Sequence, residues 1–211
     1  MNLPRRDPSN AVTLADRAAA YARSSYGQRY PDSIPVVSPT GRWLTGHWVI
    51  GNDYRAKVPL YGAYPPGYLD RLWALFPDCP TWSSRIHLFA GAVTPADGWL
   101  RIDAALHRDP KPTIYADAEA LPFPDALWYG VVAADPPYRA RDVETYGTGR
   151  LPQTRKVFAE LARVSRSGTH LCWLDIKRPM YRKAEWEWWG AITVLRSTNH
   201  LVREAFLFTR R

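Results

Sequence analysis

The fold is decided by Val131-Val132-Ala133-Ala134-Asp135-Pro136-Pro137-Tyr138, an apolar run that leads at once into a stiff polar turn. Consecutive apolar residues predict a strand buried on both faces, which occurs mainly in parallel sheets. Ligands bind parallel sheets just beyond the carboxyl ends of their strands, where the turn would lie. Its two prolines donate no N–H, so their carbonyls are left to accept hydrogen bonds. The turn therefore offers a carboxylate, carbonyls and an aromatic ring to a planar molecule that carries an NH2 group.

The rest of the chain alternates as expected of a doubly wound α/β domain. Apolar residues at helical spacing predict helices over Gly67–Phe76 and from Pro152 to Gly168. The last two predicted strands are joined by so short a link that they can pair only antiparallel. Seven strands are predicted in all, at residues 85–90, 99–104, 112–116, 128–134, 169–174, 191–196 and 203–209.

A small N-terminal extension over residues 1–57 is expected to precede the main domain over residues 58–211. Thr13-Leu14-Ala15-Asp16 has the spacing of a capping box and predicts a helix that ends near Tyr26. The segment Gly41–Lys57 alternates aromatic, basic and glycine residues and predicts an irregular hairpin.

Three segments resemble motifs of class I S-adenosylmethionine-dependent amino-group methyltransferases, most of all the small adenine-N6 DNA enzymes. Asp135-Pro136-Pro137-Tyr138 is similar to their motif IV. Ile86-His87-Leu88-Phe89-Ala90-Gly91 is similar to motif I, the first strand and the glycine turn under the cofactor. Ala116–Phe123 is similar to the segment after the third strand. The resemblance covers residues 60–211 and implies a Rossmann-like fold whose seven-stranded, mostly parallel sheet ends in an antiparallel pair.

The chain departs from that family in two ways. Gly91 and Asp103 are too close in sequence for a helix and a strand, so the first crossover is expected to be a loop or a single turn. The usual glycine-x-glycine is also replaced by Gly91-Ala92-Val93. In addition, no stretch is long enough for a separate target-recognition domain, so recognition should be short or relaxed.

S-adenosylmethionine is the cofactor that the resemblance implies. Ala90-Gly91 would give it a floor without side chains. Asp103 closes a predicted strand and could accept hydrogen bonds from both ribose hydroxyls, and Asp117 is placed to suit the adenine amino group. A cap or turn residue would look the same at either aspartate. The residues expected to bind the cofactor are Phe89, Ala90, Gly91, Asp103, Asp117, Ala118, Tyr64 and Pro65.

The motif IV resemblance also implies a mechanism. Asp135 and the Pro136 carbonyl would accept hydrogen bonds from the target amino group, so that its lone pair points at the sulfonium methyl. Tyr138 would stack on the base, which must be flipped out of a duplex to reach such a site. The residues expected to be catalytic are Asp135, Pro136, Pro137 and Tyr138.

Charge and aromatic content point to a polyanionic partner, with double-stranded DNA as the leading candidate. The net charge is +8 and the pI is near 9.7. Ten tryptophans and twelve tyrosines suit stacking on bases. The expected nucleic-acid contacts are Arg42, Trp43, Trp48, Arg55, Lys57, Arg139 and Arg141. For the first five of these residues the rival interpretation is packing in the core, and for Arg139 and Arg141 it is an ordinary solvated loop.

The remaining features favour a cytoplasmic protein without a membrane partner. No apolar run reaches the length of a membrane span, and the chain ends do not resemble signal peptides. Cys79 and Cys172 lie far apart without metal-ligand spacing, so no metal is expected. The sequence leaves the oligomeric state open.

Several functions stay open beside adenine-N6 methylation of DNA. Cytosine-N4 methylation presents the same kind of amino group, as does adenine-N6 or guanine-N2 methylation of RNA. Protein glutamine methyltransferases use a related motif that begins with asparagine, so Asp135 argues against them. From a different class, the chain could be a catalytically silent nucleic-acid-binding subunit that keeps the fold.

Overall fold

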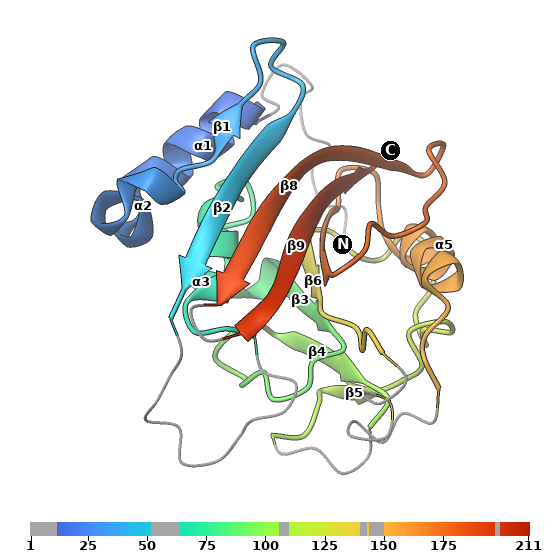
Figure 1. Cartoon of the computed structure of the whole chain (residues 1–211). Coiled ribbons are helices and arrows are strands. Elements are labelled where there is room, and N and C mark those ends of the chain that lie inside the picture. The colour runs from blue at the N-terminus through green and yellow to red at the C-terminus, as the bar shows by residue number, and fades with distance from the viewer. Residues whose placement is uncertain (1–11, 52–63, 106–109, 140–142, 144–149, 197–198) are drawn as a thin grey trace.

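The computed structural model describes residues 12–51, 64–105, 110–139, 143, 150–196 and 199–211. The expected domain boundary, between residues 57 and 58, lies outside these ranges. The described elements are arranged around one nine-stranded sheet in the order β1-β2-β8-β9-β7-β6-β3-β4-β5 (Figure 1). The strands are β1 (Val36–Val37), β2 (Leu44–Ile50), β3 (Arg85–Leu88), β4 (Leu100–Asp103), β5 (Ile114–Tyr115), β6 (Val131–Ala134), β7 (His170–Asp175), β8 (Trp186–Arg196) and β9 (Asn199–Arg210).

The seven strands predicted from the sequence are present as β3 to β9. The strands from β3 to β7 pair in parallel with one another, and β8 pairs antiparallel with β9 as the short link required. The expected total of seven is nevertheless wrong for the sheet, because β1 and β2 extend it at one edge. The result is an α/β fold with a mixed, mostly parallel sheet.

An irregular hairpin was predicted over Gly41–Lys57. Strand β2 occupies the first part of this segment, and residues 52–57 lie outside the described ranges. The strand runs parallel to β8, from Leu44 opposite Gly190 to Ile50 opposite Arg196, and pairs antiparallel with β1. Gly190 permits this close approach, since a Cβ there would lie 2.7 Å from the carbonyl oxygen of Leu44. The described part of the N-terminal segment therefore continues the main sheet.

Helices cover both faces of the sheet. They are α1 (Leu14–Arg23), α2 (Ser25–Arg29), α3 (Tyr68–Ala74) and α5 (Thr154–Val164), with 3-10 turns at Pro31–Ser33 and Trp82–Ser84. The capping box at Thr13 and Asp16 is confirmed. The first helix ends at Arg23, before the expected Tyr26, because Ser24 is extended and its side chain accepts the Gly27 N–H to begin α2.

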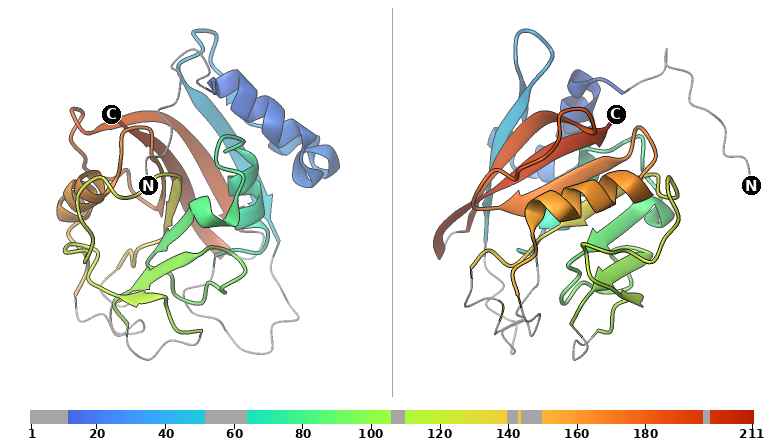
Figure 2. Two further views of the ribbon diagram at one scale, coloured as in Figure 1. Left: turned by 180° about the vertical axis from the view of Figure 1, so that it is seen from behind. Right: turned by 90° about the vertical axis from the view of Figure 1, so that its right-hand side faces the viewer.

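Figures 1 and 2 show the sheet with helices on its two sides. Two hydrophobic clusters of buried side chains fill the space between these layers. One lies between the sheet and α5, with Phe158 and Trp173 near its centre. The other lies on the opposite face, where Tyr21 of α1 stacks on Trp48 of β2 at 5.7 Å and Leu72 of α3 is fully buried. Within the described residues, no helix is long and apolar enough to cross a membrane.

A buried ionic network fixes α1 to this second face. Arg17 donates to both carboxylate oxygens of Asp78, at 2.9 and 3.0 Å, and His170 Nε2 lies 3.0 Å from the same carboxylate. Burial alone would raise the pKa of Asp78, but the hydrogen bonds from His170 and Arg17 outweigh it and hold that pKa well below its usual value. Asp78, Cys79 and His170 lie close enough to share a metal ion. The guanidinium of Arg17 already supplies the positive charge there, which disfavours a cation.

The first crossover was predicted to be a loop or a single turn. This is confirmed, since residues 89–99 form turns between β3 and β4 without a helix. This tight path encloses His87 of β3. Its ring is fully buried against Trp73, and its Nε2 lies 3.2 Å from the Asp97 carbonyl oxygen. Burial lowers the pKa of His87 to about 4.

We predict that His87 makes the protein less stable as the pH falls from about 6.5 to about 4. The unfolded chain binds a proton on this histidine near its ordinary pKa, whereas the folded chain resists protonation down to about pH 4. Neutral His87 therefore makes its full contribution to the free energy of unfolding at pH values above its pKa in the unfolded chain. About 3 kcal/mol of stability is lost as the pH falls to the folded-state pKa. Urea unfolding of His87→Gln at several pH values should give a flatter profile than the parent. The exposed control His47→Gln should keep the parental profile, and an unchanged profile for His87→Gln would contradict the prediction.

Candidate active site

An aspartate closes or shortly follows each of the parallel strands β4, β5, β6 and β7, at the carboxyl edge of the sheet. They are Asp103, Asp117, Asp135 and Asp175. Strand β3 lies between β4 and β6, so the chain first builds the sheet outward through β4 and β5 and then returns to add β6 on the other side. This reversal is a topological switch point, and ligands bind open α/β sheets in the crevice beside such a point.

The turn after β3 carries backbone strain. Phe89 has φ of 59° and Gly91 has φ of 51°, and a left-handed conformation is uncommon for a residue with a side chain. The Phe89 ring packs edge-on against Trp173 of β7, with their centroids 5.9 Å apart. Such strain persists where surrounding contacts hold it and often marks a functional site. Here it turns the chain sharply at the switch point.

Asp103 ties the loops of β3 and β4 together. Its Oδ2 accepts the N–H of Gly91 and its Oδ1 accepts the N–H of Ala105, each at 2.8 Å, and the residue is buried. A role in holding this backbone was not foreseen from the sequence. The expected contact with ribose hydroxyls stays a prediction, which would use the lone pair that each oxygen retains.

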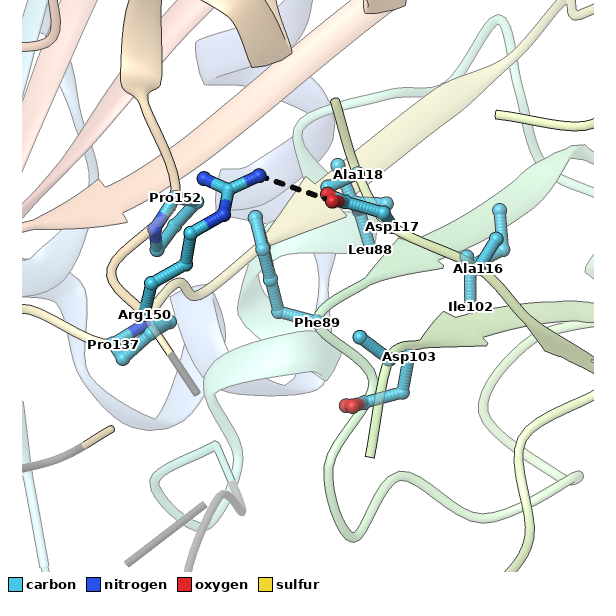
Figure 3. Close-up of a pocket in the computed structure, with 11 residues that line it drawn as sticks. Leu88, Phe89, Ile102, Asp103, Ala116, Asp117, Ala118, Pro137, Arg150 and Pro152 are labelled. Carbon is cyan, nitrogen blue, oxygen red and sulfur yellow. Dashed lines mark hydrogen bonds and ion pairs between the residues drawn. The ribbon is translucent and has the colours of Figure 1, made fainter. Parts of the chain in front are cut away.

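A cavity of about 60 Å³ lies on the α5 side of this edge (Figure 3). It brings together several residues expected to bind a cofactor, namely Phe89, Asp103, Asp117 and Ala118. Pro137 of the proline turn is also part of its wall. Six further residues line the cavity although the sequence did not predict them as site residues: Leu88, Ile102, Ala104, Ala116, Arg150 and Pro152.

Arg150 reaches across this cavity (Figure 3). Its Nη2 lies 3.1 Å from Asp117 Oδ2, and its Nη1 donates to Glu119. Glu119 also accepts the N–H of Gln153, which joins the loop before α5 to the segment after β5. The side chains of Arg150 and Asp117 are 51% and 53% exposed, so their ion pair is open to water.

A second polar group lies at the same edge, on the α3 side of the sheet. Tyr138 donates its hydroxyl hydrogen to Asp135 Oδ1. Arg203 of β9 places Nη1 3.5 Å from Asp135 Oδ2 and 3.5 Å from the Tyr138 hydroxyl. The side chains of Arg203 and Asp135 are 10% and 14% exposed. Arg203 was not foreseen, because a lone arginine within a strand gives no signal in the sequence.

Tyr64 and Pro65 do not line the cavity that holds Phe89 and Asp117. The Tyr64 ring stacks on Tyr68 at 5.2 Å, and its hydroxyl is buried without a hydrogen-bond partner in the described structure. Burial, with the nearby charge of Asp135, raises the pKa of Tyr64 well above its ordinary value. Tyr64 thus lies near Asp135, and the expected contact of Tyr64 and Pro65 with a cofactor stays a prediction.

The residues expected to contact nucleic acid have separate outcomes. Trp48 is fully buried between Tyr21 and Tyr68, so its predicted contact with bases is wrong, and it stabilises the core. Trp43 is partly exposed and packs against Trp188, while Arg42 is exposed and Arg139 is partly buried. Arg55, Lys57 and Arg141 lie outside the described residues.

Asp175 was also missed, although it follows an apolar strand just as Asp135 does. It is partly buried and accepts hydrogen bonds from the Trp173 indole and from the N–H groups of Ile176 and Lys177. Burial raises its pKa above the ordinary value. An apolar run that ends in aspartate was the signal that could have identified it.

No protein-family model matches the chain, and no curated protein is similar enough to match it.

We predict that the two aspartates of the cavity differ in their effect on folding. Asp103→Asn should lower the free energy of unfolding by about 1–3 kcal/mol, because an amide NH2 would face a buried backbone N–H. Asp117→Asn should change it by less than about 0.5 kcal/mol, since that side chain is at the surface. Urea unfolding followed by circular dichroism measures both. Equal losses for the two variants would show that the backbone contacts of Asp103 do not stabilise the loops.

Proposed function

We propose that this protein transfers a methyl group from S-adenosylmethionine to an exocyclic amino group of a nucleic-acid base, with adenine N6 in DNA as the leading target. The observation that carries the proposal is the position of Asp135-Pro136-Pro137-Tyr138. This turn directly follows β6 at the switch point of the sheet. Its Pro137 borders the cavity of Phe89 and Asp117, while Asp135 lies in the polar group on the other face.

The sheet supports a finer description of the fold. Seven strands, mostly parallel and ending in an antiparallel pair, are what the class I methyltransferase resemblance implies. Strands β3 to β9 agree with that description. We therefore regard β3 to β9 as a class I methyltransferase core, to which β1 and β2 add an edge.

The residues of the cavity suit S-adenosylmethionine chemically. Leu88, Phe89 and Ile102 offer apolar surface to an adenine ring, while the carboxylates of Asp103 and Asp117 suit hydroxyl, amino and positively charged groups. Arg150 reaches across the cavity to the Asp117 carboxylate, so a ligand that binds this carboxylate would compete with the guanidinium. Exposed ion pairs are weak, so this competition would oppose binding only slightly.

The chemistry at the target follows from the polar group. When bound, S-adenosylmethionine supplies an electrophilic methyl group. Asp135 and the Pro136 carbonyl would each accept a hydrogen bond from the target NH2, so that the nitrogen lone pair points away from the base plane toward the methyl carbon. The N–C bond would form as the bond between the methyl carbon and sulfur breaks, so that a neutral thioether leaves and positive charge grows on nitrogen beside the Asp135 carboxylate. The methylated nitrogen is acidic and releases its proton to water, so Asp135 need not be a strong base.

We predict that Asp135→Ala abolishes methyl transfer but keeps cofactor affinity. Loss of an oriented acceptor should slow single-turnover transfer at least about 100-fold. Calorimetry should give a dissociation constant for S-adenosylmethionine within about threefold of the parent value, because Asp135 is not part of the cavity wall. The exposed control Asp32→Ala should transfer at the parental rate. A rate for Asp135→Ala within threefold of the parent would overturn the assignment.

The product identifies the target. The parent protein is incubated with DNA or RNA and methyl-labelled S-adenosylmethionine, and the nucleic acid is digested to nucleosides for mass spectrometry. Labelled N6-methyladenine from DNA supports the leading proposal, whereas N4-methylcytosine or a methylated ribonucleoside assigns one of the alternatives. Binding of nucleic acid and cofactor without any labelled product would indicate a silent subunit.

A basic and aromatic group at the edge of the sheet supports a nucleic-acid partner. Trp43 precedes β2 and packs edge-on against Trp188 of β8, with centroids 4.5 Å apart. The Arg178 guanidinium lies 5.2 Å from the centre of the same Trp188 ring, and Arg42 adjoins Trp43 in the chain. Both arginines are exposed. Cationic groups beside aromatic faces are suited to phosphates and bases.

We predict that the double variant Arg42→Ala/Arg178→Ala binds nucleic acid more weakly and with less dependence on salt. Each lost phosphate contact should reduce the slope of log affinity against log salt by about 0.9, so the slope should fall by about 2 units. Fluorescence anisotropy over a salt series measures it. The matched control Arg23→Ala/Arg29→Ala removes two exposed arginines of α1 and α2 and should keep the parental slope. An unchanged slope for the first variant would show that nucleic acid binds elsewhere.

A further inference from the structure

We propose that Arg203 is a positioning residue that orients the Asp135 carboxylate toward the target amino group. This inference rests on the proposed function of Asp135. Arg203 would touch neither the cofactor nor the methyl group, and would act through the carboxylate that it holds.

The sheet brings these two residues together although they are far apart in the chain. Strand β7 pairs with β6 on one side and with β9 on the other. Side chains alternate along a strand, so Asp135 shares a face with Ala133, and Arg203 shares one with Ala205. Ala133 and Ala205 belong to the same core cluster, on the α3 side. Asp135 and Arg203 therefore face each other across β7 on one side of the sheet.

Each carboxylate oxygen of Asp135 is held by a different donor. Arg203 Nη1 lies 3.5 Å from Oδ2, and the Tyr138 hydroxyl donates to Oδ1. The same Nη1 lies 3.5 Å from the Tyr138 hydroxyl oxygen, so Arg203 contacts both Asp135 and Tyr138. A carboxylate oxygen can accept more than one hydrogen bond, which leaves acceptor capacity for a target N–H. These two contacts restrict rotation of the carboxylate before a target binds.

A buried hydroxyl, that of Tyr64, lies near both Arg203 and Asp135. Burial is the largest cause of the raised pKa of Tyr64, while the charge of Asp135 also raises it and the charge of Arg203 lowers it. The Tyr64 hydroxyl is buried nearby without a partner in the described structure, and buried polar groups are seldom left unpaired without a functional reason.

Single-turnover kinetics of Arg203→Met and Arg203→Lys test the proposal. Arg203→Met should slow methyl transfer at least 30-fold while the dissociation constant for S-adenosylmethionine and the KM for DNA stay within about threefold of the parent values. Arg203→Lys keeps the positive charge and should recover at least a third of the parental rate. If Arg203→Met fails to fold, as judged by circular dichroism, Arg203→Gln replaces it with the same expected loss.

A double-mutant cycle separates positioning from a general structural role. If Arg203 acts only through Asp135, then Asp135→Ala/Arg203→Met should transfer no more slowly than Asp135→Ala alone. A rate for Arg203→Met within threefold of the parent, or losses that add in the double variant, would overturn the inference.

The same cycle measured by urea unfolding tests the contact independently of activity. Non-additive losses of stability are expected for Asp135→Ala and Arg203→Met, whereas additive losses would show that the two side chains do not interact. A parent protein that methylates no nucleic acid would refute the proposed function, while the unfolding cycle would still report on the contact between Arg203 and Asp135.

Discussion

Parallel pairing of β3 with β6 positions the proposed site and the elements around it. Its register sets Leu88 opposite Ala134, so the next residues, Phe89 and Asp135, leave the sheet side by side at the switch point. The apolar residues of β6, together with Ile86 and Leu88 of β3, make burial between two helical layers favourable. The strained turn at Phe89 and the stiff proline turn after Asp135 then direct the segments that follow β3 and β6 along the same edge of the sheet.

At both ends of the sheet, a buried or partly buried aspartate is paired with an arginine. Near the amino ends of the strands, Arg17 pairs with Asp78 beside His170 and anchors α1. At the carboxyl end, Arg203 pairs with Asp135, but here the groups border the proposed target site. A buried ion pair contributes little net stability, because desolvation offsets the attraction between the charges. The pair at Asp135 is therefore expected to contribute little to the stability of the fold, which agrees with its proposed role in orienting the carboxylate.

Local patterns predicted some elements well and others poorly. The apolar run before Asp135, the capping box at Thr13 and the tight crossover after Gly91 depend on neighbours in the chain, and the structure confirms each of them. Strand β2 was misjudged because a polar, aromatic and glycine-containing segment is typical of a loop. It becomes a strand because β8 offers an open edge, and because Gly190 lets the Leu44 backbone approach.

The class of fold, the seven core strands and the edge of the sheet with the aspartates could be predicted from the sequence, because they depend on periodicity and on the direction of the chain. Which side chains meet at that edge could be seen only in the folded structure. It showed that Asp103 holds the loop backbone, that Arg150 spans the cavity to Asp117 and that Arg203 faces Asp135. Pairing across β7 joins residues that are distant in the chain, and such contacts leave no mark on local patterns. The burial of Trp48 has the same cause, since a residue's exposure depends on what packs against it.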